Sequence, residues 1–146
     1  MIKNLDHINI VVSDLQKAKK FFLDLGFKEV NSAYLSGKQL SVVTGLPDIE
    51  AEFIAISLAG SSTNIELIKY YSPKGGLDPN MSKPNQLGFR HIAFEVEDIE
   101  KEVERLKSKG VKFESDVQTW EKTGKKLVYF YGPDGIILEL AQYPEE

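Results

Sequence analysis

Hydrophobic and polar residues alternate along residues 5–12, which predicts a half-buried β-strand. Ile8, Ile10 and Val12 fall on one face of this strand, and His7 falls on the opposite face. The apolar face is expected to pack against a helix, because apolar side chains gain free energy when a neighbouring element removes them from water. His7 is therefore expected to point toward whatever the sheet encloses on its other side.

After this strand, apolar residues recur every three or four positions, which predicts an amphipathic helix. Ser13 is its predicted N-cap, and Gln16 completes the pattern of a capping box. Gly26 is expected to end the helix in a left-handed conformation, which glycine adopts without a steric penalty. The predicted apolar stripe of the helix consists of Leu15, Ala18, Phe22 and Leu25.

The same pattern returns 84 positions later, without a gap in the alignment. His7 then aligns with His91, and Gly26 aligns with Gly110. A repeated strand–helix–glycine unit indicates a duplication. It predicts a second strand around His91 and a second helix that begins at Asp98. The two repeats contain the 2 histidines of the chain.

Three further strands are predicted to complete each repeat. In the first repeat they span residues 27–35, 53–58 and 64–70. Residues 37–45 fit a short helix or a strand, and we favour the short helix. In the second repeat they span residues 111–114, 126–131 and 136–143. A polar loop is predicted over residues 115–124, in which Trp120 either covers a pocket or fills the loop.

The sequence therefore predicts an α+β fold of two tandem βαβββ modules. We expect them to form one curved eight-stranded mixed sheet around a metal-containing cavity, in a single domain over residues 1–146. The first module covers about residues 1–72 and the second about 88–146. Residues 73–87, rich in proline and glycine, are predicted as a linker and a candidate mobile flap.

Composition and charge exclude several classes of function. The formal net charge of −4 and the lack of a basic cluster argue against nucleic acid as a partner. The chain has no cysteine, so thiolate metal sites and catalytic thiols are excluded. No apolar run is long enough for a membrane span, and the N-terminal residues lack the pattern of a signal peptide. The expected location is the cytoplasm.

Two glutamates occupy matching places on the last strand of each repeat. Glu66 and Glu139 each lie between large apolar residues, so alternation places their carboxylates on the same face as the histidines. An inward carboxylate is costly unless it is paired or bound to a metal. The two carboxylates and two imidazoles are expected to converge on one divalent ion: Zn, Ni, Co, Mn or Fe(II). The predicted metal ligands are His7, Glu66, His91 and Glu139.

Together these motifs resemble the vicinal oxygen chelate superfamily. That superfamily includes glyoxalase I, methylmalonyl-CoA epimerase, extradiol dioxygenases, and fosfomycin and bleomycin resistance proteins. The resemblance covers essentially the whole chain and identifies the same four residues as ligands. It rests on Asp6-His7-Ile8, Asn64-Ile65-Glu66-Leu67, Arg90-His91-Ile92-Ala93-Phe94, Gly132-Pro133-Asp134-Gly135 and Leu138-Glu139-Leu140.

The resemblance implies a metal-dependent isomerase or lyase that moves a proton α to a carbonyl through an enediolate. Glu139 is the predicted base, and Glu66 is its partner on the opposite face of the substrate. Bacterial glyoxalase I has this ligand pattern, whereas the epimerases have glutamine at the Glu66 position. Val11 stands where glyoxalase I has an arginine that holds glutathione. The substrate thus stays open between a methylglyoxal thiohemiacetal and an acyl-CoA.

Two other functions of the same fold stay open as alternatives. One is a drug-binding or resistance protein, although the bleomycin-binding relatives lack the four metal ligands. The other is an extradiol-type dioxygenase, in which two histidines and one glutamate leave iron positions open. In each case the resemblance implies a homodimer that binds a small molecule.

Overall fold

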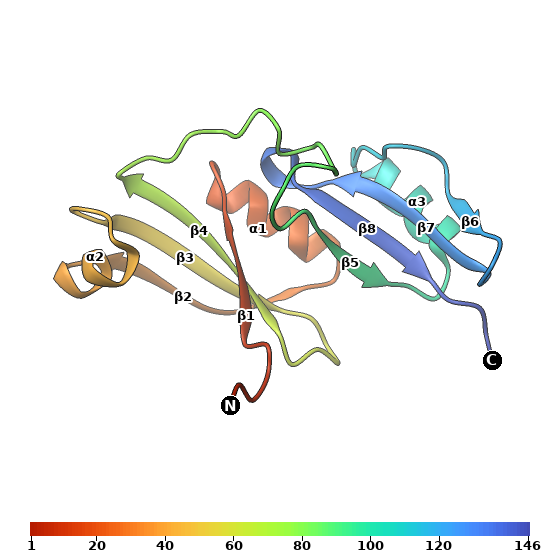
Figure 1. The fold of residues 1–146 in the computed structure, drawn as a ribbon, viewed down its shortest axis with the longest axis horizontal. Helices are drawn as coiled ribbons and strands as arrows, with labels where there is room; N and C mark the ends of the chain where they lie inside the picture. The colour runs from red at the N-terminus through yellow and green to blue at the C-terminus, as the bar shows by residue number, and fades with distance from the viewer. The chain divides into compact units, whose positions relative to one another are not determined.

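The computed structural model describes residues 1–146. It divides into two compact units, Met1–Gly76 and Leu77–Glu146. Each unit contains one of the repeats found in the sequence, and each is described by itself. Figure 1 shows the strands of the first unit in red to yellow-green and those of the second in green to blue.

The first unit is a four-stranded mixed sheet with two helices. Its strands follow the order β1-β4-β3-β2, with β1 parallel to β4 and the other two pairs antiparallel. The predicted short helix is present as α2. The elements are β1 (His7–Val11), α1 (Leu15–Asp24), β2 (Lys28–Ser36), α2 (Lys38–Thr44), β3 (Glu50–Ser57) and β4 (Asn64–Ser72).

The second unit repeats this topology in the order β5-β8-β7-β6, with β5 parallel to β8. Its elements are β5 (His91–Glu95), α3 (Ile99–Ser108), β6 (Gln118–Trp120), β7 (Lys125–Tyr131), the 3₁₀ turn η1 (Pro133–Gly135) and β8 (Ile137–Gln142). The α+β class and the two βαβββ modules are confirmed. One detail differs from the prediction, because the hydrogen-bonded strands form two four-stranded sheets instead of one eight-stranded sheet. The reason is that each first strand pairs with the last strand of its own module.

The helix of each module covers one face of its sheet. Helix α1 packs on β3 and β4, and its stripe residues Leu15, Ala18 and Phe22 are buried, as predicted. Ile65 and Leu67 of β4 are also buried. Burying each such large apolar side chain contributes about 1.5–3 kcal/mol. The alternation of the strands therefore turns the other face, with its polar residues, away from the helix.

Both main helices begin at an aspartate. The predicted N-cap Ser13 is wrong by one residue: the cap is Asp14, whose side chain accepts a hydrogen bond from the N–H of Lys17 at 3.1 Å. Asp98 accepts from the N–H of Lys101 at the same distance. In both helices the cap carboxylate accepts a hydrogen bond from an N–H group of the first turn that has no partner within the helix. Its negative charge also interacts favourably with the positive end of the helix dipole.

The edge strand of the second unit lies in the region predicted as a loop. Residues 111–114 form no strand and make only an isolated bridge from Phe113 to Phe130. The edge strand is β6, where Trp120 pairs with Lys125 and stays 57% exposed, so it does not fill a loop. The backbone of residues 111–114 joins β7 only through the hydrogen bonds on either side of the Phe113–Phe130 bridge, from the N–H of Glu114 to the carbonyl of Tyr129 and from the N–H of Tyr131 to the carbonyl of Lys112.

The segment before β5 folds back onto its own unit. Arg90 Nη2 donates hydrogen bonds to the carbonyls of Asn80 (3.3 Å) and Met81 (3.0 Å). Ser82 Oγ donates to the carbonyl of Gly135 at 2.6 Å. These contacts anchor the predicted flap to the turn that leads into β8. None of the helices is long and apolar enough to cross a membrane.

Candidate metal centre

The first unit brings His7 and Glu66 together. They come from β1 and β4, whose parallel register places Asn9 directly beside Glu66. His7 lies two residues before Asn9 and therefore on the same face of the sheet. His7 Nε2 lies 3.4 Å from Glu66 Oε2, and the side chains are 43% and 31% exposed. The sheet face on which they meet is the one that α1 leaves open.

Asp6 orients the imidazole of His7. The Nδ1 of His7 is 2.7 Å from Oδ2 of Asp6, so an Nδ1–H donates to the carboxylate and Nε2 is directed toward Glu66. This hydrogen bond, more than the charge of Glu66, raises the pKa of His7 above its ordinary value. A carboxylate on the outer nitrogen is the usual partner of a metal-binding histidine, because it fixes the tautomer.

The second unit brings His91 and Glu139 together in the same way. His91 Nε2 lies 3.1 Å from Glu139 Oε2. Glu139 is 4% exposed and is the buried charged residue of the structure. The ring of Tyr129, the direct partner of Glu139 on β7, lies 5.1 Å from the ring of His91. The duplicated His–Glu motif thus folds into two corresponding half-sites.

Lys125 completes the second half-site and was missed by the sequence analysis. Its Nζ lies 3.1 Å from Glu139 Oε1, an ion-pair distance, although the angles do not make a hydrogen bond. The direct side-chain contact with Glu139 raises the pKa of Lys125 above its ordinary value, and the charge of Glu139 adds to this effect. The signal was present in the alternation of β7, since Lys125 and Tyr129 are four residues apart and share a face.

The four predicted ligands therefore occur as two His–Glu pairs, one in each unit. Neither unit gathers three metal-ligating side chains on its own. An imidazole nitrogen with a carboxylate oxygen fits a borderline divalent ion such as zinc, nickel or cobalt. Each pair places an imidazole nitrogen close to a carboxylate oxygen, at 3.4 Å in the first unit and 3.1 Å in the second, so the two donor types lie together in both units. The residues present thus fit a divalent metal.

Comparisons with known proteins agree with this architecture. A glyoxalase family protein from Bacillus cereus has a structure that matches with a TM-score of 0.90 at 29% identity, covering 99% of this chain and 97% of that one. The uncharacterized protein YwkD of Bacillus subtilis (strain 168) is 31% identical over 96% of this chain and 97% of its own length. Mitochondrial methylmalonyl-CoA epimerase of Mus musculus is 27% identical over 94% of this chain and 72% of its own length.

The family model for the glyoxalase/bleomycin resistance protein/dioxygenase superfamily matches residues 4–140. This range includes both His–Glu pairs, the two helices that carry the aspartate caps, and all eight strands except the last residues of β8. The chain therefore belongs to the glyoxalase/bleomycin resistance protein/dioxygenase superfamily, in agreement with the resemblance of its histidine and glutamate motifs.

Proposed function

We propose that this protein is a metal-dependent isomerase or lyase that moves a proton α to a carbonyl group. The observation that carries the proposal is the pairing of His7 with Glu66 at 3.4 Å and of His91 with Glu139 at 3.1 Å, in two corresponding half-sites. An imidazole and a carboxylate at matching places of a duplication supply the nitrogen and oxygen donors that a borderline divalent ion takes.

The proposed ligands of the divalent ion are His7, Glu66, His91 and Glu139. When bound, such an ion withdraws negative charge from two adjacent substrate oxygens and so makes the neighbouring C–H acidic. The side chains of the protein then have to accept the proton and return it. One of the two carboxylates, that of Glu139, is nearly buried and lies beside Lys125.

Glu139 is the proposed base, and Glu66 acts on the opposite face of the substrate. Glu139 lies beside Ala93 on β5 and beside Tyr129 on β7. Glu66 is flanked by Asn9 and is more exposed, which suits a carboxylate that keeps its position.

An acyl thioester is the substrate class that we favour. The epimerase from Mus musculus is similar to 94% of this chain, over 72% of its own length. Val11, which is exposed on the His7 face of β1, provides no cation for glutathione. A methylglyoxal thiohemiacetal is the second substrate class, since both substrates present a carbonyl beside an acidic C–H.

The test measures metal content together with proton exchange. The metal-loaded protein is incubated in deuterium oxide with a 2-methyl acyl-CoA or a 2-keto hemithioacetal, and deuterium incorporation is followed by mass spectrometry. Glu139→Gln keeps the shape of the side chain but cannot accept a proton, so exchange should fall about 10²–10⁴-fold. Exchange by Glu139→Gln at the wild-type rate would show that Glu139 is not the base.

A drug-binding protein without a metal is the second candidate function. It is favoured by one observation: in each half-site the imidazole and carboxylate satisfy one another, and Lys125 neutralises Glu139 without an ion. Absence of any bound metal, together with absence of exchange on both substrate classes, would favour this function over the enzyme.

We further propose that the protein is a cytoplasmic homodimer. Strands β2 and β6 are sheet edges with unpaired backbone groups, which proteins commonly cover. Light scattering at micromolar concentration should give about twice the chain mass of 16.4 kDa. A mass of one chain at every concentration would contradict the dimer.

A further inference from the structure

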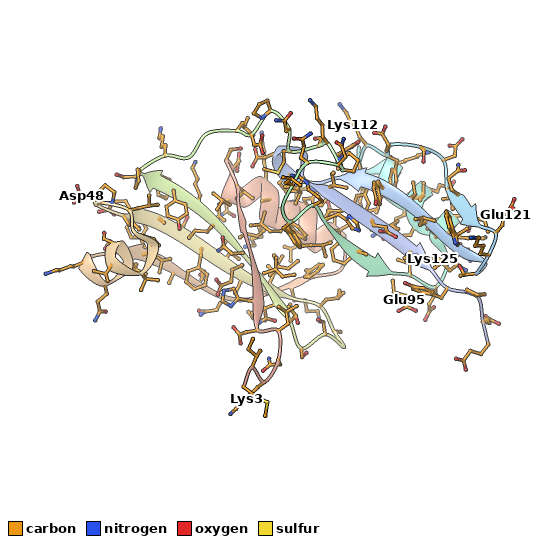
Figure 2. All side chains as sticks on the ribbon, viewed as in Figure 1. Lys3, Asp48, Glu95, Lys112, Glu121 and Lys125 are labelled. Atoms are coloured by element: carbon orange, nitrogen blue, oxygen red, sulfur yellow. The ribbon has the colours of Figure 1, made fainter.

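Glu139 has a cationic neighbour on its own sheet. Lys125, at the start of β7 and labelled in Figure 2, has its Nζ 3.1 Å from Glu139 Oε1. His91 faces the other oxygen, Oε2, at 3.1 Å. The ring of Tyr143 lies 5.4 Å from the ammonium of Lys125, which is thereby held between an acid and an aromatic ring. Both oxygens of Glu139 are thus in use.

The first unit has no cation at the corresponding place. Glu66 lies opposite Ala55 on β3, as Glu139 lies opposite Tyr129 on β7. The residue four positions before Ala55 is Ala51, which corresponds to Lys125. Ala51 is fully buried in an apolar cluster with Ile68. The two modules therefore share the His–Glu pair but differ in its counter-ion.

This difference has a consequence for metal binding. A divalent ion that binds Glu139 must compete with the ammonium of Lys125 for the same carboxylate, because two cations repel one another at such distances. A metal that binds Glu66 meets no such competitor. A metal at the His91–Glu139 pair would therefore be held less tightly through its carboxylate than a metal at the His7–Glu66 pair, although the isolated carboxylates are chemically identical.

We propose that Lys125 is a positioning residue that makes Glu139 the detachable ligand. It competes with the metal for the carboxylate and holds Glu139 when two oxygens of an incoming ligand displace it. This inference rests on the proposed function, since it assumes that the His–Glu pairs bind a metal. It adds the reason why Glu139, and not Glu66, is free to act on the substrate.

The first measurement is the affinity of the full chain for cobalt(II), by calorimetry at low ionic strength. Lys125→Met removes the charge and keeps the length of the side chain, so cobalt should bind about tenfold more tightly. Lys125→Arg retains the charge and should bind within about threefold of wild type. The matched control is Lys126→Met, which removes the ion pair with Glu100 (2.7 Å) on the other face of β7 and should change affinity less than about twofold.

The second measurement is the affinity of the cobalt-loaded protein for acetohydroxamate, a chelating ligand with two vicinal oxygens, followed by visible absorption. Because Lys125→Met leaves Glu139 bound to the metal, acetohydroxamate should bind about tenfold more weakly than to wild type. A residue with only a structural role would not tighten one affinity and weaken the other. In the Glu139→Gln background, Lys125→Met should change both affinities much less than it does in the wild-type background, since the carboxylate with which it couples is gone.

Several outcomes would overturn the inference. Unchanged or weaker cobalt binding by Lys125→Met, with unaltered circular dichroism, would mean that Lys125 does not compete for Glu139. An equal effect of Lys126→Met would mean that only net charge matters. If wild type binds no cobalt, the proposed metal centre fails together with this inference. If wild type binds cobalt and the variants do not differ, this inference alone fails.

Discussion

Asp6 determines which nitrogen of His7 is available to a ligand. Its carboxylate lies 2.7 Å from Nδ1, and Nε2 lies toward Glu66. The pKa of His7 is raised above 6.5 by this hydrogen bond first, and then by the charges of Glu66 and Asp6. Protonated His7 is favoured in the folded, metal-free protein, so protons compete with a metal for this residue at near-neutral pH.

Replacing Asp6 by asparagine should lower the pKa of His7 in the metal-free protein. The pKa of His7 in the folded chain is raised, so its stabilising contribution is present below the unfolded value of about 6.5 and is lost as pH rises through the folded pKa. In Asp6→Asn, the free energy of unfolding should not show this decrease as pH rises. Proton NMR titration of the imidazole C–H signals measures the pKa of His7 in wild type and in Asp6→Asn, with the His91 signals as an internal reference. An unchanged His7 pKa in Asp6→Asn would contradict the role given to Asp6.

Glu66→Gln should be the milder of the two glutamate substitutions. Glutamine still offers an oxygen to a metal, and Glu66 lies in the more exposed half-site, without a counter-ion. We expect cobalt affinity to fall less than about tenfold and deuterium exchange to fall less than in Glu139→Gln. The comparison needs both variants at saturating metal. An equal or larger loss of exchange in Glu66→Gln would exchange the roles proposed for the two carboxylates.

At the scale of elements, the aspartate caps fix where each helix begins and therefore which residues reach the sheet. Asp14 has an extended backbone, with φ −131° and ψ 103°, and the helix begins at Leu15. Asp98 has nearly the same angles, φ −137° and ψ 94°. The hydrogen bond from Lys101 lowers the pKa of Asp98, so this cap is retained above the ordinary carboxylate pKa and lost as pH falls through the folded one.

Asp14→Ala should destabilise the chain by about 0.5–2 kcal/mol, the usual effect of losing an N-cap side chain. Asp14→Asn is the matched control, because asparagine caps a helix about as well as aspartate. Urea unfolding followed by circular dichroism measures the free energy of unfolding of each variant. Equal stability of Asp14→Ala and wild type would show that the cap at Asp14 adds nothing.

At the scale of the whole molecule, a metal bound to the folded state couples its site to stability. A ligand present at 100 times its dissociation constant stabilises the folded state by about 2.7 kcal/mol. Purified protein should therefore melt at a lower temperature after EDTA treatment and recover when cobalt or zinc is added. His91→Ala, which removes one imidazole, should show no shift with metal. A melting temperature that EDTA and added metal leave unchanged would contradict the metal centre.

The fold class and the composition of both half-sites were predictable from the sequence. Side chains alternate strictly along a strand, so His7 had to share a face with Asn9, and Glu66 had to face away from buried Ile65 and Leu67. The duplication then extended the same conclusion to the second module. These inferences need only local geometry, which holds whatever the rest of the chain does.

Other features depend on how strands pair and could not be predicted locally. Residues 118–120 belong to a stretch that the sequence predicts as a loop, and all three are exposed in the structure. Only their hydrogen bonds with β7 make them a strand. From the sequence alone, Lys125 cannot be distinguished from an ordinary surface lysine such as its neighbour Lys126. The register of β7 on β8 places Lys125 against Glu139 and Lys126 against Glu100 of α3.

The sequence by itself thus determined the two modules, the face of each strand and the two His–Glu pairs. These follow from periodicity, which is written into neighbouring residues. Only the tertiary structure decided that Glu139 is buried beside a lysine while Glu66 is half exposed without one. That asymmetry depends on contacts between residues far apart in the chain, and their alignment is set by strand register and by the packing of whole elements.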